Sequence, residues 1–229
     1  MWRDRRNSFG TRMRGLSITV SQPSDDAFET RKYDIILNMR NSKINRTTKE
    51  TDITLELQLD GSGEGVIDTG IGFFNHMLEQ LSAHSGIDID LDAKALDNNF
   101  HHLIEDCAIT LGQAILEALK DKKGIKRYSN IILPMDEALI LCALDISGRA
   151  YFKMNIELKD NITDDFETIL FHHFFNSLAN NSGICLHLKM FDGYDTHHII
   201  EASFKAFARC LRESIKIEGS EIPSTKGLL

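Results

Sequence analysis

The sequence contains one structural plan twice. Residues 101–119 read HHLIEDCAITLGQAILEAL, and residues 197–215 read HHIIEASFKAFARCLRESI, an offset of 96 residues from 101 to 197. Upstream, FFNHMLEQLSAHSGIDIDL (73–91) matches LFHHFFNSLANNSGICLHL (170–188) at an offset of 97 residues. Repeated units stack to bury their apolar faces against each other. We therefore expect an α+β fold of two pseudo-symmetric halves, each a sheet covered by two helices.

Hydrophobic spacing predicts the elements of each half. Two apolar stripes recur at helical spacing, one from Ile104 to Leu119 and one from Ile200 to Ile215. Gly86 and Gly183 follow runs of helix formers and predict helix ends. Strands are predicted at 53–59, 87–93, 138–146, 150–158 and 184–190. We expect a flexible N-terminal extension (1–45), a first half (46–130), and a second half with a C-terminal substrate-binding tail (131–229).

Composition excludes several classes of partner. The formal net charge of −8 argues against a nucleic-acid partner, and no apolar run is long enough to span a membrane. Four cysteines without CxxC spacing favour reduced thiols and a cytoplasmic location. The first 14 residues contain five arginines, which leaves organelle targeting open beside a plain flexible tail.

The paired histidines predict metal binding. His101 and Glu105 lie four residues apart on one helix face and can bind one cation, whereas His102 points well away. Adjacent imidazoles therefore serve different ions, and eight candidate ligands divide into two sites of four: His76, His101, His102, Glu105, His173, His197, His198 and Glu201. A nitrogen and oxygen set without thiolates favours Mn²⁺, Fe²⁺ or Co²⁺ over a structural zinc.

The other readings of these histidines differ in strength. A single HHxxE motif is better explained by two exposed histidines at a helix start than by a metal site. Its recurrence in equivalent positions, each with an upstream histidine, favours metal binding. His187 is more typical of a structural strand residue, and His172 stays ambiguous. His84 ends a predicted helix, where it suits either the helix dipole or a substrate contact.

Several sequence blocks resemble the imidazoleglycerol-phosphate dehydratase family. The resemblance runs from about Arg46 to the C-terminus in these blocks: RTTKETDITLELQLDGSG (46–63), DTGIGFFNHML (68–78), HHLIEDCAITLGQAI (101–115), GIKRY (124–128), PMDEAL (134–139), DISGR (145–149), HHIIEASFKAFARCLRESI (197–215) and IPSTKGLL (222–229). It implies a hydro-lyase that converts imidazole glycerol phosphate to imidazole acetol phosphate in histidine biosynthesis. It also implies two Mn²⁺ per active site and a homo-oligomer of 24 subunits.

The resemblance also implies roles for single residues. One ion would be bound by His76, His102, His197 and Glu201, and the other by His101, Glu105, His173 and His198. The catalytic group would comprise Glu50, His76, His102 and Glu201, with Glu50 as the acid/base residue. The substrate contacts would be Glu50, His84, Arg127, Arg149, Lys205, Ser224, Thr225 and Lys226.

The sequence departs from the family pattern beside several ligands. Asn75, Asn99, Phe100 and His172 stand where carboxylates are usual. Carboxylates behind a metal ligand orient it, so their loss predicts metal affinity about 10–100-fold weaker. Two other functions stay open: a dinuclear hydrolase of a phosphorylated small molecule, and a non-catalytic assembly held together by metal ions.

Overall fold

The computed structural model describes residues 40–229, and most of the expected N-terminal extension lies outside this part. The first half runs through strands β1 (Asn41–Thr47), β2 (Thr51–Gln58) and β3 (Gly65–Asp68), helix α2 (Gly72–Ser85), strand β4 (Asp88–Ala95) and helix α3 (Phe100–Leu119). The second half contains β5 (Tyr128–Met135), β6 (Ala138–Asp145), β7 (Tyr151–Asn155), the short pair β8 (Ile162–Thr163) and β9 (Phe166–Glu167), α4 (Ile169–Ser182), β10 (Cys185–Asp192) and α5 (Thr196–Ser214).

The two halves have the same topology, which confirms the predicted duplication. The first sheet has the strand order β1-β2-β4-β3 and the second β5-β6-β10-β7. In both, the first three strands are antiparallel and the last pair is parallel. The parallel pair in each half is joined through a helix, α2 or α4, because parallel neighbours need a crossover connection.

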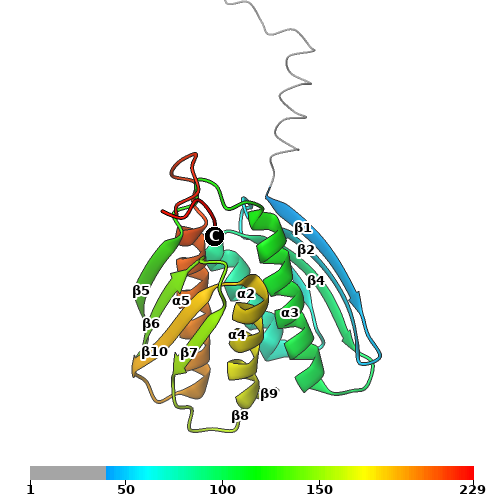
Figure 1. Ribbon diagram of the computed structural model, residues 1–229. Helices are drawn as coiled ribbons and strands as arrows, with labels where there is room; N and C mark the ends of the chain where they lie inside the picture. The colour runs from blue at the N-terminus through cyan, green and yellow to red at the C-terminus, as the bar shows by residue number, and fades with distance from the viewer. Residues whose placement is uncertain (1–39) are drawn as a thin grey trace, which may run out of the picture. The chain divides into compact units, whose positions relative to one another are not determined.

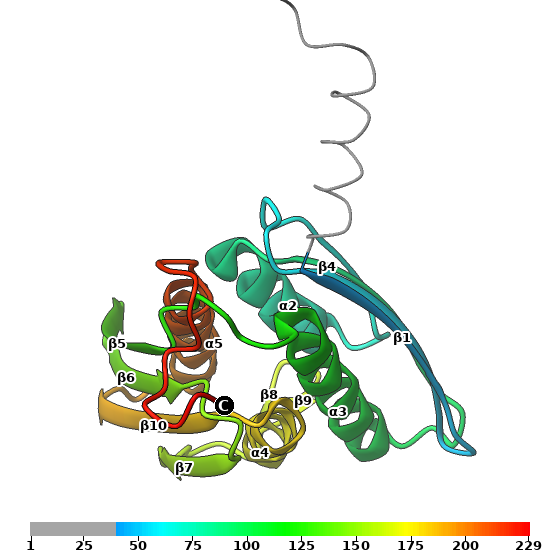
Figure 2. The same ribbon diagram turned by 45° about the horizontal axis from the view of Figure 1, so that its top comes forward.

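The four helices lie between the two sheets (Figures 1 and 2). Helices α2 and α3 cover the first sheet, and α4 and α5 cover the second. Across the middle of the domain, α3 packs on α4 and α2 packs on α5. The inward residues of β2 and the apolar stripes of α3 and α5 are buried in this core. Each half therefore buries its apolar face against the other, as the repeat predicts.

Glycines allow left-handed helix ends at two positions and a close helix–helix contact at a third. Gly86 and Gly183 end α2 and α4 in the left-handed conformation, with φ of 74° and 67°, which confirms the predicted helix ends. Gly112 lies inside α3 where it meets α4. A Cβ atom at this position would lie 2.7 Å from the backbone oxygen of Leu178. The tight contact between these two helices therefore depends on the missing side chain.

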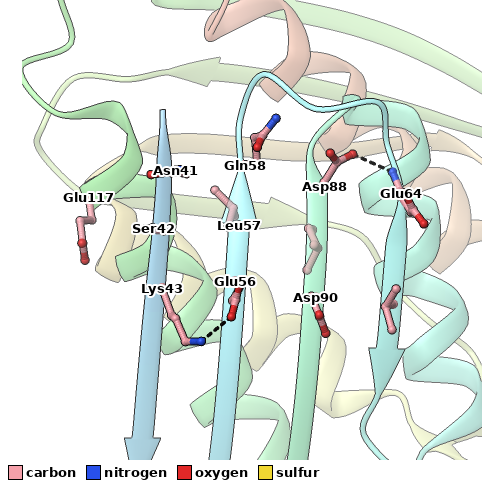
Figure 3. A pocket seen from close by; sticks show the side chains of 12 residues that line it. Asn41, Ser42, Lys43, Glu56, Leu57, Gln58, Glu64, Asp88, Asp90 and Glu117 are labelled. Atoms are coloured by element: carbon pink, nitrogen blue, oxygen red, sulfur yellow. Dashed lines mark hydrogen bonds and ion pairs between the residues drawn. The ribbon is translucent and has the colours of Figure 1, made fainter. Parts of the chain in front are cut away.

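The outer face of the first sheet is polar (Figure 3). Lys43 on β1 pairs with Glu56 on β2, and Asp88 accepts hydrogen bonds from the amides of Ser62, Gly63 and Glu64. These side chains surround a shallow hollow that contains no histidine. The histidines predicted to bind metal ions therefore lie elsewhere.

Some element boundaries differ from the predictions. The sheets begin at Asn41 and Tyr128, so the boundaries expected at 46 and 131 fall inside β1 and β5. Strand β1 was missed because only Ile44 among its residues is a large apolar one. Strand β5 was missed because Pro134 argues against a strand, although an edge strand tolerates proline. None of the helices from residue 40 onward is long and apolar enough to cross a membrane.

Candidate metal centre

One predicted ligand cluster forms where α2 meets α5. His76 comes from the first turns of α2, and His197 and Glu201 come from the first turns of α5. The Nε2 atom of His76 lies 3.6 Å from Glu201 Oε1, and the Nε2 atom of His197 lies 3.3 Å from Glu201 Oε2. Two imidazole nitrogens and a carboxylate oxygen thus converge within 4.8 Å of one another, close enough to share one ion.

The duplicated counterpart forms where α3 meets α4. The rings of His101 and His173 have centroids 4.7 Å apart, and His101 Nε2 lies 4.0 Å from Glu105 Oε2. His101 corresponds to His197 in the repeat, Glu105 to Glu201, and His173 to His76. The pseudo-symmetry therefore brings His101 against both of its equivalent partners, but among the described residues only the His76 group has its three ligand atoms within 4.8 Å of one another.

The second histidine of each HHxxE motif turns away from these clusters. The ring planes of His101 and His102 are inclined by 80°, and those of His197 and His198 by 85°, as the helical geometry predicts. Within residues 40–229, His102 lies with Glu50 and Asp97 and does not join the His76 cluster. A single copy of the chain therefore gathers three of the four ligands expected for the first ion.

Carboxylates lie against the Nδ1 atoms of three histidines. Asp97 lies 2.6 Å from Nδ1 of His102, Glu137 2.9 Å from Nδ1 of His198, and Asp164 2.9 Å from Nδ1 of His197. The hydrogen bonds to Asp97 and Glu137 raise the pKa of His102 and of His198. The bond from His198 is also the largest cause that lowers the pKa of Glu137 to about 2. The sequence predictions missed all three carboxylates as members of the site.

Glu201 is held ionised although it is buried. Burial alone would raise the pKa of its carboxyl group, but Lys205, His76 and His197 lower it by more. Lys205 Nζ lies 2.7 Å from Glu201 Oε1. All the histidine motifs lie at helix N-termini, whose positive dipole ends disfavour a bound cation. Ionised carboxylates at these ends offset that repulsion, so the nitrogen and oxygen donor set fits a divalent metal ion.

The residues that depart from the family pattern have other contacts. Asn99 caps α3 by accepting the His101 amide at 3.0 Å, and Asn75 accepts the Thr69 hydroxyl at 2.6 Å. His172 lies against the ring of Phe152, and burial lowers its pKa. Phe100 at the start of α3 is half exposed. The expectation of weakened metal binding left out Asp97, which supplies a carboxylate to His102 from two residues before Asn99.

A second cavity gathers most of the predicted substrate contacts. A hollow of about 840 Å³ is bordered by the β6–β7 connection and the C-terminal tail. Five predicted substrate contacts line it: Arg127, Arg149, Ser224, Thr225 and Lys226. Arg127 is buried and already engaged, since it donates to Asp145 at 2.7 Å and to the Pro223 carbonyl at 2.8 Å. Arg127 therefore holds the tail in place, while Arg149 and Lys226 supply the cations best suited to an anion.

The cavity and the histidine clusters lie at opposite ends of the helices. The Arg127 amide bonds the carbonyl of Ser214, the last residue of α5, whereas His197 is its second residue. Seventeen residues of helix at about 1.5 Å each separate them by about 25 Å. In Figure 1 the tail lies at the upper ends of α3 and α5, and β8 and β9 lie at the opposite end.

The other three predicted substrate contacts lie outside this cavity. Lys205 is one turn from Glu201 on α5 and contacts it directly. His84 is at the end of α2, where burial, followed by the charges of Lys205 and Arg209, lowers its pKa. Glu50 lies in the turn between β1 and β2, with Oε2 3.8 Å from Nδ1 of His102. The predicted contacts thus divide between the two ends of the helical layer.

Comparisons with known proteins agree on one family. The model of the imidazoleglycerol-phosphate dehydratase family matches residues 69–211. An imidazoleglycerol-phosphate dehydratase from Methanococcoides burtonii is 53% identical over 192 residues, covering 83% of this chain and 100% of that protein. One from Chlorobium phaeobacteroides is 48% identical over 194 residues, covering 83% and 96%.

Solved structures give the same result. The crystal structure of imidazoleglycerol-phosphate dehydratase from Staphylococcus aureus has a TM-score of 0.71 and 36% identity, with 77% of this chain and 99% of that one covered. The enzyme from Pyrococcus furiosus, crystallised in complex with (S)-C348, has a TM-score of 0.72 and 37% identity, with 81% and 100% covered.

Proposed function

The chain belongs to the imidazoleglycerol-phosphate dehydratase family, the hydro-lyases that dehydrate imidazole glycerol phosphate in histidine biosynthesis, and we propose that its activity requires two Mn²⁺ ions. The observation that carries the proposal is the convergence of His76, His197 and Glu201 within 4.8 Å of one another at helix N-termini. Their equivalents in the repeat also adjoin, since His101 contacts His173 and Glu105. Three nitrogen and oxygen donors leave positions on each ion for a fourth ligand and for substrate.

Each of the two equivalent groups of residues would bind one ion. His76, His197 and Glu201 would bind the first, and His101, His173 and Glu105 the second, with His102 and His198 as the fourth ligands. When bound, the two ions would act as Lewis acids that fix the imidazole ring of the substrate and stabilise negative charge on it. Ligands of this type must be deprotonated, and the low pKa of Glu201 fits that requirement.

Other residues of the chain would handle protons and the phosphate group. We propose Glu50 as the acid/base residue, because its carboxylate is half exposed beside His102 and free to meet a substrate. Arg149, Lys226 and the hydroxyls of Ser224 and Thr225 would bind the phosphate through charge-assisted hydrogen bonds. Arg127 would support this group by anchoring Pro223.

The working site would combine at least two copies of the chain. A substrate of one ring, three carbons and a phosphate spans less than about 10 Å at about 1.5 Å per bond. The cavity lined by Arg149, Ser224, Thr225 and Lys226, called the anion cavity from here on, lies about 25 Å from the histidines of the same chain along α5. We therefore propose a homo-oligomer, with 24 subunits as the expected assembly, in which one copy binds the phosphate beside the histidines of another.

A chelation experiment tests the proposal. The purified full chain is stripped with a chelator and supplied with imidazole glycerol phosphate, with and without added Mn²⁺. We expect dehydration only after Mn²⁺ is restored, with two ions bound per chain. Full turnover by the stripped protein would refute the metal requirement. Release of inorganic phosphate would instead favour the hydrolase, and metal-dependent assembly without any turnover would favour the scaffold.

Glu50→Gln tests the acid/base role separately. We expect this variant to bind two Mn²⁺ and to assemble normally, because Glu50 makes no contact shorter than 3.8 Å with His102. Its turnover should fall by about 100-fold or more, the usual contribution of a positioned acid/base group. Wild-type turnover with both ions bound would remove Glu50 from the mechanism.

A further inference from the structure

Three acidic side chains meet the paired histidines from outside the helices that carry them. Asp97 comes from the connection between β4 and α3, Glu137 from the turn between β5 and β6, and Asp164 from the turn between β8 and β9. Each places a carboxylate oxygen 2.6 to 2.9 Å from an imidazole Nδ1 atom. The recurrence on three separate loops indicates a shared task at the site.

A carboxylate at Nδ1 determines what the other ring nitrogen can do. The Nδ1 atom must carry a proton to donate to the carboxylate, so the neutral ring keeps an unshared electron pair on Nε2. The same hydrogen bond stops rotation of a half-exposed ring. Hydrogen bonds of this kind behind metal-binding histidines fix the tautomer and orientation and raise the basicity of the ring.

The duplication shows that the two halves have divided this task differently. Glu50 directly precedes β2, and Glu137 directly precedes β6, so the two glutamates occupy equivalent positions. In the second half Glu137 bonds His198 directly, at 2.9 Å. In the first half Glu50 stays 3.8 Å from His102, and Asp97 makes the bond instead, at 2.6 Å. Asp97 thereby leaves the Glu50 carboxylate available.

We propose that Asp97, Glu137 and Asp164 are positioning residues, which hold His102, His198 and His197 with the proton on Nδ1 and Nε2 free for a metal ion. This inference rests on the proposed Mn²⁺-dependent function. It adds that the two halves use different residues for this hydrogen bond: Asp97 bonds His102 in the first half, and Glu137 bonds His198 in the second. Glu50 can then serve the substrate, while its counterpart Glu137 serves a ligand.

Asp97 offers the sharpest test because its two oxygens have different partners. One accepts the Asn99 amide at 2.9 Å, and the other meets His102. In Asp97→Asn the remaining oxygen keeps the Asn99 amide, and the NH₂ group faces Nδ1 of His102. An amide donor there favours the opposite tautomer, with the proton on Nε2. Asp97→Ala releases the ring without imposing either tautomer.

The readouts are metal affinity and histidine tautomer, both measured on the full-length protein. Free Mn²⁺ followed by electron paramagnetic resonance should show affinity weakened about 10–100-fold in Asp97→Ala, and at least as much in Asp97→Asn. Solid-state NMR of metal-free protein with ¹⁵N-labelled histidine, at a pH where the rings are neutral, should show one ring moving to the Nε2–H form in Asp97→Asn.

Asp92→Asn is the matched control. It removes the same charge from the exposed face of β4, where Asp92 pairs with Lys94 and meets no histidine. We expect wild-type affinity and tautomers in this control. Glu137→Gln and Asp164→Ala should reproduce the loss of affinity at their own histidines. The Gln variant is preferred for Glu137 because Glu137 also accepts the Asp195 amide at 2.9 Å and supports the start of α5.

The outcomes separate the inference from the proposed function. Wild-type affinity and unchanged tautomers in the Asp97 variants would overturn the positioning role while leaving Mn²⁺ dependence intact. A wild-type protein that binds no Mn²⁺ would overturn the proposed function. The tautomer measurement would then still decide whether Asp97 controls His102, and an unchanged spectrum in Asp97→Asn would refute that as well.

Discussion

Mixed assemblies of two inactive variants should recover activity. One variant, Glu201→Gln, removes the buried carboxylate of the α2–α5 cluster. The other, Arg149→Ala with Lys226→Ala, removes the free cations of the anion cavity. If the histidines and the cavity of one site come from different copies, a site is intact when one copy supplies the first and another supplies the second.

The expected magnitude follows from the separation of about 25 Å along α5, which a substrate under about 10 Å long cannot span. When the two variants are co-expressed in equal amounts, half of the sites receive an intact histidine cluster, and independently half receive an intact anion cavity. About one quarter of the sites should then be intact, so activity should reach about 25% of wild type. If both parts of a site came from one copy, every site would carry a defect and the mixture would stay inactive.

A reversed mixture provides the control. A chain with all three substitutions, co-expressed in equal amounts with the wild type, should give about 25% activity for a shared site and about 50% for a site within one copy. Turnover of imidazole glycerol phosphate is measured per total chain, after mass spectrometry confirms mixed oligomers. The shared site would be refuted if the mixture of the two inactive variants stayed inactive while the mixture of triple variant and wild type retained about 50% of wild-type activity.

Three further predictions concern stability and the tail. Gly112→Ala should lower the free energy of unfolding by about 1–2 kcal/mol, because a clash with the Leu178 carbonyl outweighs the gain of about 1 kcal/mol from alanine in a helix. Urea denaturation measures this change. A stabilised variant would contradict the close packing of α3 on α4. Asp88→Ala should cost about 2 kcal/mol at pH 7, since three amides bond the carboxylate. Burial raises the pKa of Asp88, but these bonds lower it overall from 3.8, so the stabilisation is complete above about pH 5 and is lost as pH falls through the lower folded pKa. Urea midpoints of wild type and variant that stay equally far apart down to pH 3 would contradict this. Arg127→Met should raise KM much more than it changes Mn²⁺ affinity, because Arg127 anchors the tail at Pro223 and lies far from the histidines; steady-state kinetics and Mn²⁺ titration check this, and an unchanged KM would contradict it.

The sequence predicted the duplication and the direction of each paired histidine on its helix because both follow from local rules. Helical periodicity places His101 and Glu105 on one face and turns His102 away, whatever the surrounding fold. The repeat then extends the same conclusion to His197, His198 and Glu201. The main helices and five strands were predicted for the same reason, since their apolar spacing is a property of short segments.

Only the tertiary structure decided which groups meet across long stretches of sequence. Asp164 reaches His197 and Glu137 reaches His198 because turns of the second half fold over the start of α5, and no short-range pattern records these contacts. Five residues of the anion cavity were named from the sequence as substrate contacts, which stays a prediction, but their place at the far end of α5 depends on the packing of the tail against Arg127 and the β6–β7 connection. Periodicity fixes the direction of a side chain on its own helix, whereas its partners depend on how distant segments pack.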